Sequence, residues 1–122
     1  MKLLAPKKYL EAPPAFIDEI TGGCGPGGFG DWVIPDRMWG LSIKPACMIH
    51  DWEYHFGTTS TDKSIADDNF LDNMIRIIID ADGYYTLRWL RRQRAAKYHF
   101  FVVHFGGPSF WSGKDTEYVE VA

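Results

Sequence analysis

The chain has 122 residues, of which 46% are hydrophobic and 24% are charged, and its formal net charge is −3. These values predict one globular domain over residues 1–122 with a core of its own, and the negative charge argues against a generic nucleic-acid-binding protein. No apolar run approaches the roughly 18 residues that span a bilayer, and the first residues lack the apolar stretch and cleavage pattern of a secretory signal.

The N-terminal third is rich in residues that interrupt regular structure. Residues 1–21 contain Pro6, Pro13 and Pro14, and they predict an arm with at most one short helix around AFIDEI. In residues 21–31, six of the eleven are glycine, which predicts a loop with unusual backbone angles. This loop does not read as a phosphate-binding P-loop, because no Gly-Lys-Ser/Thr sequence follows it.

A first long helix is predicted from Pro45 to about Gly57, because Pro suits a first helical turn and Gly suits a stop. Its apolar residues recur three and four apart at Ala46, Ile49, Trp52 and Phe56. On this helix His50 and Tyr54 are four residues apart and share a face. Asp51 is rotated by about 100° from His50.

A second helix is predicted over residues 62–81, after a polar turn and before Gly83, which we expect to end it. Its apolar stripe consists of Ile65, Phe70, Met74, Ile77 and Ile78. Two helices joined by a short turn pack antiparallel, so Asp67 or Asp68 can approach His50. We expect Asp68 and Asp72 to face solvent.

A carboxylate beside His50 predicts acid–base chemistry, although an isolated His-Asp pair on a helix is usually a solvated face. The carboxylate fixes the tautomer of the imidazole and makes its other nitrogen a better base. Asp51 is then left for a different role. Glycine carbonyls of the loop and a carboxylate are the oxygen ligands that Ca²⁺ prefers. Together these groups predict a hydrolytic site, in which a metal polarises a carbonyl and a base activates water.

The C-terminal third offers weaker signals. A third helix is predicted from about residue 84 to 98, and residues 99–105 either extend it or form a strand. Residues 106–122 predict a C-terminal tail in loop conformation, with a possible strand at EYVEV. His55, His99 and His104 have no obvious partner.

Residues 84–104 contain five Lys or Arg residues and no acid. Two interpretations of this segment remain open. It contacts anionic lipid headgroups, or it is an ordinary surface helix with a buried Leu/Trp stripe and a cationic outer face.

Three motifs, in order, resemble the phospholipase A2 superfamily. The segment CGPGG, residues 24–28, is similar to its calcium loop, and CMIHDWEY, residues 47–54, is similar to its active-site helix. The segment ADDNF, residues 66–70, resembles its second helix, with Ala66 where secreted members have Cys. The resemblance covers residues 22–74. It implies a mainly α, phospholipase A2-like fold whose two antiparallel helices carry the active site, with a Gly-rich calcium loop and little or no β-wing.

The resemblance also implies a calcium site. Asp51 would bind Ca²⁺ through its carboxylate, and the backbone carbonyls of Gly23, Gly25 and Gly27 would complete the protein ligands. Cys24 and Cys47 occupy family positions that are bridged to each other. Such a disulfide would pin the calcium loop to the active-site helix, and a loop of this size contributes on the order of 3 kcal/mol. Two reduced thiols are the alternative.

For catalysis, the resemblance implies that His50 is the general base for water attacking a phospholipid sn-2 ester. Asp67 would orient His50, and Tyr54 would hydrogen-bond to Asp67. The oxyanion would lie on Ca²⁺ and the Gly25 N–H. The partner is then a phospholipid membrane surface, bound peripherally.

Having at most one disulfide and little or no β-wing, the chain is closer to the reduced bacterial or viral branches of the superfamily. Such a protein would be made in the cytosol and then released or packaged in a virion. Two other functions compete with the hydrolase. One is a non-catalytic binding or structural module on the same fold, and the other is a phage or virion component that breaches membranes.

Overall fold

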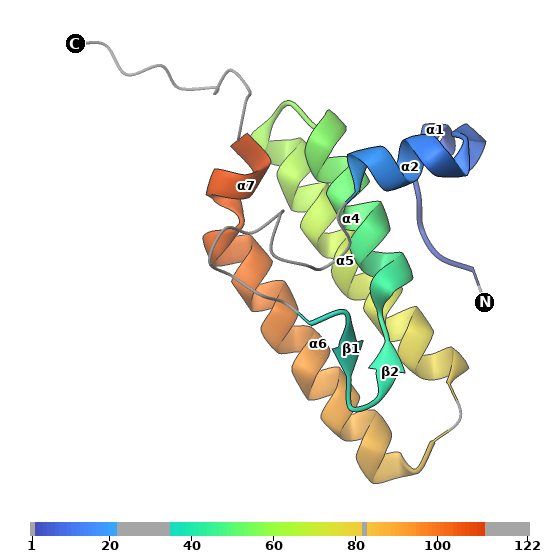
Figure 1. Cartoon of the computed structure of the whole chain (residues 1–122). Coiled ribbons are helices and arrows are strands. Elements are labelled where there is room, and N and C mark those ends of the chain that lie inside the picture. The colour runs from blue at the N-terminus through green and yellow to red at the C-terminus, as the bar shows by residue number, and fades with distance from the viewer. Residues whose placement is uncertain (1, 22–34, 82, 112–122) are drawn as a thin grey trace.

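The structure is a computed structural model, and it describes residues 2–21, 35–81 and 83–111. Figure 1 shows the elements in chain order. They are α1 (Lys7–Glu11), α2 (Pro14–Ile20), β1 (Arg37–Met38), β2 (Leu41–Ser42), α4 (Lys44–Phe56), α5 (Ser60–Asp80), α6 (Tyr85–Phe105) and α7 (Gly107–Trp111). The described part is therefore mainly helical, as the sequence predicts.

The two predicted long helices are confirmed, and local signals set their adjoining ends. The N–H of Gly57 donates to the carbonyl of Glu53 over 2.8 Å and closes α4. The side chain of Thr59 accepts from the backbone N–H of Asp62, whose carboxylate accepts from the N–H of Thr59. This capping box starts α5 at Ser60, two residues earlier than predicted. The connection is therefore only three residues long and forces the helices to run antiparallel.

Helix α5 lies between α4 and α6 and contributes to both interfaces (Figure 1). The predicted core residues of α5 are buried: Phe70, Met74, Ile77 and Ile78. Ile65, predicted as part of the same stripe, is 51% exposed, so that prediction is wrong. At about 100° per residue, position 65 lies on the opposite side of α5 from these four residues, and it lines a groove under the N-terminal arm.

The N-terminal arm forms two short helices, α1 and α2, where at most one was predicted. Each follows a proline, Pro6 or Pro13, whose fixed backbone angle suits a helix start. The buried side chain of Asn73 accepts from the N–H of Leu4 over 2.6 Å and donates to its carbonyl over 2.8 Å. This pair of hydrogen bonds ties the start of the arm to α5.

Helix α6 continues to Phe105, so residues 99–105 extend the helix and do not form a strand. Short helix α7 begins the tail, for which loop was predicted. The described strands pair in a hairpin before α4, with Trp39 and Gly40 at positive φ in its turn. No strand separates α4 from α5, as expected of a fold without a β-wing there. None of the helices described has both the length and the apolarity to cross a bilayer.

Candidate functional site

His50, Tyr54 and Asp67 meet in the interface between α4 and α5. His50 Nε2 lies 2.8 Å from Asp67 Oδ1, and the Tyr54 hydroxyl donates to the same oxygen over 2.6 Å. All three residues are buried, with His50 only 1% exposed. The structure thus brings together the three residues that the sequence placed on facing helices. Their proximity follows from the short α4–α5 turn, which sets the register of the two helices.

Lys63 belongs to the same cluster, although it was not among the predicted site residues. Its ammonium group donates to Asp67 Oδ2 over 2.7 Å and to the carbonyl of Val102 over 2.9 Å. Lys63 precedes Asp67 by four residues on α5, and this spacing was the one signal that could have indicated an ion pair. The contact with Val102, 39 residues away, ties the C-terminal end of α6 to the cluster.

Asp67 is held as a carboxylate by its partners. Burial alone would raise its pKa, but hydrogen bonds from His50, Lys63 and Tyr54 lower the pKa below the ordinary value. An ionised carboxylate can only accept hydrogen bonds, so Nε2 of His50 carries the proton in this pair. Burial and the negative charge of Asp67 raise the pKa of Tyr54, which keeps its hydroxyl protonated as a donor.

The His50 imidazole is held neutral. Burial lowers its pKa, and the positive charge of Lys63 adds to this effect, although Asp67 opposes it. The ring stacks on Phe70, with the two ring centroids 4.6 Å apart. Because Nε2 is oriented by Asp67, Nδ1 is the nitrogen that carries the basic lone pair. A neutral imidazole with a fixed tautomer is suited to accept a proton at neutral pH.

The predicted calcium site is only partly within the described residues. Gly23, Gly25 and Gly27 lie outside them, so their predicted roles stay predictions. Asp51 follows His50 on α4, is half-buried, and has a buried Oδ2 atom. A carboxylate is a suitable ligand for a hard cation such as Ca²⁺. Within the described ranges no three His, Cys, Asp or Glu side chains gather around one point.

The predicted disulfide also reaches outside the described residues. Cys47 lies on α4, one turn before His50 and Asp51, and is 3% exposed. Its predicted partner, Cys24, is not among the residues that the structure describes. The Cys24–Cys47 bridge therefore stays a prediction.

The remaining acidic and histidine candidates lie outside the cluster. Asp68 is 77% exposed, as predicted, and Asp72 pairs with Arg76 at the surface. No partner for His99 was obvious from the sequence, but its Nε2 lies 3.2 Å from Asp68 Oδ1. No local sequence signal indicates this pair, because it joins α5 to α6, whose register no local pattern sets.

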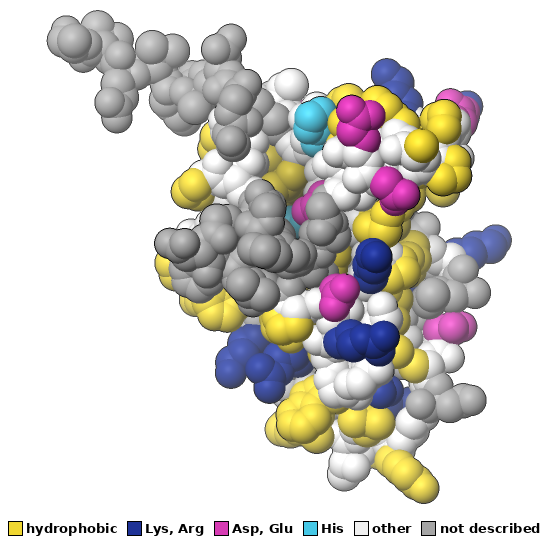
Figure 2. All heavy atoms as spheres, in the orientation of Figure 1, with side chains coloured by type: hydrophobic (Ala, Val, Ile, Leu, Met, Phe, Trp, Pro, Cys, Tyr) yellow, Lys and Arg dark blue, Asp and Glu magenta, His cyan; other side chains and the backbone are white. Residues whose placement is uncertain are grey.

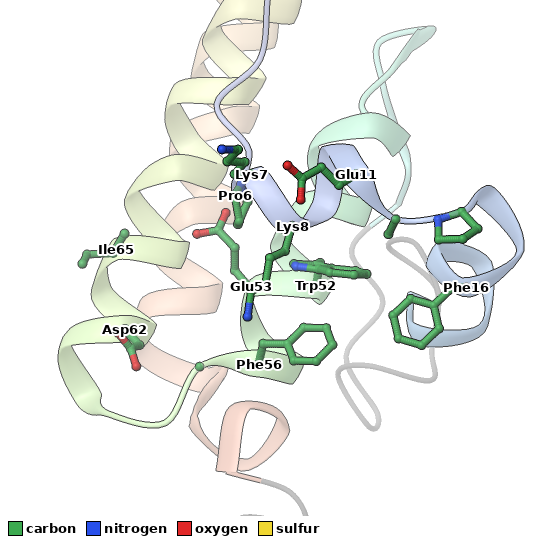
Figure 3. Close-up of a pocket in the computed structure, with 13 residues that line it drawn as sticks. Pro6, Lys7, Lys8, Glu11, Phe16, Trp52, Glu53, Phe56, Asp62 and Ile65 are labelled. Atoms are coloured by element: carbon green, nitrogen blue, oxygen red, sulfur yellow. The ribbon is translucent and has the colours of Figure 1, made fainter.

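A groove of about 780 Å³ lies on the other side of α4 from His50. Figure 3 shows Trp52 and Phe56 of α4 facing Phe16 of the arm across it, with the Glu53 carboxylate at one side. Burial raises the pKa of Glu53 to about 7. Neither His50 nor Asp67 lines this groove, so it is separate from the cluster.

Comparisons of the chain with protein-family models, curated proteins and solved structures gave no match.

Proposed function

We propose that this protein is a Ca²⁺-dependent hydrolase that cleaves the sn-2 acyl ester of a phospholipid, on a phospholipase A2-like fold. The observation that carries the proposal is the buried hydrogen bond between His50 Nε2 and Asp67 Oδ1, 2.8 Å long, with Tyr54 on the same oxygen. A base oriented by a carboxylate is the arrangement that ester hydrolysis by activated water requires.

In this mechanism His50 Nδ1 removes a proton from a water molecule while the water oxygen attacks the ester carbonyl carbon. The imidazolium that forms is stabilised by Asp67, which remains ionised because Lys63 and Tyr54 also donate to it. When the tetrahedral intermediate collapses, His50 returns the proton to the leaving lysophospholipid alkoxide. General-base catalysis of this kind contributes roughly 10²–10⁴-fold to the rate.

A calcium ion fits the proposal because Asp51, the neighbour of His50, offers oxygen ligands of the required type. The backbone carbonyls of Gly23, Gly25 and Gly27 are the other proposed ligands, and the Gly25 N–H is a proposed oxyanion donor. When bound, Ca²⁺ supplies electrostatic stabilisation of the charge that develops on the carbonyl oxygen.

The test measures fatty-acid release from phospholipid vesicles by the wild type and by the variant His50→Gln. We expect the wild type to hydrolyse the lipid only with Ca²⁺ present, and His50→Gln to lose at least 10²-fold in rate. The matched control is His55→Gln, which makes the same change at an exposed position of the same helix. Hydrolysis that persists in excess chelator, or in His50→Gln, would exclude the proposal.

A second candidate is a non-catalytic binding module on the same fold. The groove between the arm and α4 favours it, because aromatic and aliphatic side chains line most of its wall (Figure 3). This candidate predicts that an apolar probe quenches or shifts the fluorescence of Trp52, that Phe56→Ser weakens this effect, and that no lipid turns over. Turnover that depends on His50 would decide for the hydrolase.

A further inference from the structure

The outward face of α6 carries a stripe of exposed apolar side chains. The residues that face the core are Arg91, Ala95, Tyr98 and Val102. On the opposite side lie Tyr85, Trp89, Ala96, Phe100 and Val103, whose spacing places them on one side of the helix. The exposed fractions of the four large members are 82% for Tyr85, 53% for Trp89, 52% for Phe100 and 42% for Val103.

This arrangement departs from that of an ordinary surface helix at two positions, Trp89 and Arg91. Such a helix would bury its tryptophan and expose its arginines, which was one of the two interpretations of this segment. Here Trp89 is half exposed, whereas Arg91 is only 7% exposed and donates to the carbonyl of Trp39 over 2.9 Å. A run of exposed aromatic residues on one helix face indicates an interaction surface.

The charges around this stripe are positive. Arg92 and Lys97 are both exposed and flank the stripe on its two sides. No Asp or Glu occurs from residue 83 to residue 114 of the sequence. Asp68 of α5 contacts His99 at the edge of the helix. In Figure 2 the side of the molecule along α6 presents yellow and dark blue side chains together.

These charges argue against a second copy of the chain as the partner. The stripe is nearly symmetric about a point between residues 94 and 95. In an antiparallel pair Trp89 would meet Phe100, but Arg92 would then meet Lys97. In a parallel pair, Arg92 would face Arg92 of the second copy, and Lys97 would face Lys97. Either arrangement brings like charges together, which destabilises the pair.

We propose that the outward face of α6 is the surface on which this protein binds an anionic lipid bilayer. The helix lies parallel to the membrane plane, with Trp89 and Phe100 inserted among the headgroups and acyl chains and with Arg92 and Lys97 on anionic headgroups. Aromatic side chains with polar edges, such as Trp89 and Tyr85, suit this interface. The inference rests on the proposed function, since it assigns the surface by which the hydrolase reaches its substrate.

The test is cosedimentation of the full chain with vesicles of diether phosphatidylglycerol or diether phosphatidylcholine, in the presence of a chelator. Diether lipids have no acyl ester, so binding is measured without hydrolysis. We expect binding to the phosphatidylglycerol vesicles that is at least tenfold stronger than to phosphatidylcholine and that weakens with added salt. The double variant Trp89→Ser/Phe100→Ser should lose at least tenfold in partitioning.

The matched control is the double variant Leu10→Ser/Ile79→Ser, which removes two exposed apolar side chains that lie outside α6 and outside the groove, and it should bind as the wild type does. Thermal melts establish that both double variants fold. Equal binding by wild type and the α6 variant, or no binding by the wild type, overturns the proposal. The proposal is also overturned if the wild type is a dimer and the α6 double variant is a monomer while the control double variant stays dimeric. The face would then serve self-association. His50→Gln should still cosediment with vesicles. Loss of hydrolysis without loss of binding therefore tests the proposed function, and loss of binding tests the α6 surface.

Discussion

Lys63 and Asp67 lie one turn apart on α5, and the Lys63 ammonium donates to Asp67 Oδ2 over 2.7 Å. A second ion pair of the same spacing, Arg76 with Asp72, lies further along the helix at 2.8 Å. The pairs differ in burial, because the side chains of the first are 14% and 2% exposed and those of the second are 39% and 47% exposed. The energetic contributions of a buried and an exposed ion pair can therefore be compared within one helix.

The first prediction compares Lys63→Met with Arg76→Met. Loss of Lys63 leaves a buried carboxylate short of one donor and detaches the carbonyl of Val102, so the free energy of unfolding should fall by roughly 1–3 kcal/mol. Loss of Arg76 should change it by less than about 1 kcal/mol. Urea unfolding measures both values. Equal losses in the two variants would mean that the burial of the Lys63 pair has no energetic consequence.

The second prediction concerns Asp67→Asn. The amide has the size of the carboxylate but cannot accept from His50, Tyr54 and Lys63 together, so the His50 tautomer is no longer fixed. Hydrolysis should fall on the order of 10³-fold, while the circular dichroism spectrum stays that of a folded helical protein. The adjacent exposed position supplies the control, since Asp68→Asn should stay within about twofold of the wild-type rate. A fully active Asp67→Asn enzyme would remove Asp67 from the mechanism.

The third prediction concerns Asn73, which is fully buried and holds the backbone of Leu4 through two hydrogen bonds. Asn73→Ala should lower the free energy of unfolding by about 1–3 kcal/mol and release the start of the arm. Hydrogen exchange at the Leu4 amide should speed up, whereas amides in the middle of α5 should keep their protection. An unchanged exchange rate at Leu4 would show that another contact holds the arm.

The fourth prediction concerns Glu53, whose Oε2 accepts from Asn69 over 3.1 Å at the side of the groove. Its pKa is raised from 4.5 to about 7, mainly by burial. Between these values the folded chain keeps a proton that the unfolded chain has lost, so this carboxyl lowers stability as pH rises through the window. Glu53→Gln removes the titration. Its free energy of unfolding, relative to wild type, should therefore increase from pH 4.5 to pH 7.5 in urea melts, and a constant difference would contradict the assignment.

Much of the site could be predicted from local sequence signals. The spacing of apolar residues and the Gly57 stop predicted α4, and the short polar turn predicted that α5 returns beside it. His50 and Tyr54 share a face because four residues make about one helical turn. Because the turn is only three residues long, Asp67 lies at the same height along the helix pair as His50. The contact between these residues therefore follows from helix geometry and turn length.

Other features depended on contacts between distant segments. Lys63 joins the cluster because Val102 of α6 lies beside it, and the sequence does not set the register between α5 and α6. Residues 99–105 are short and apolar, a pattern that suits helix and strand equally, and packing on α5 selects the helix. Periodicity separates the two faces of α6 but does not decide which one packs inward. The tertiary structure decided that Arg91 is buried and Trp89 faces outward. A buried guanidinium needs acceptors, and the carbonyl of Trp39, from a distant segment, supplies one at 2.9 Å.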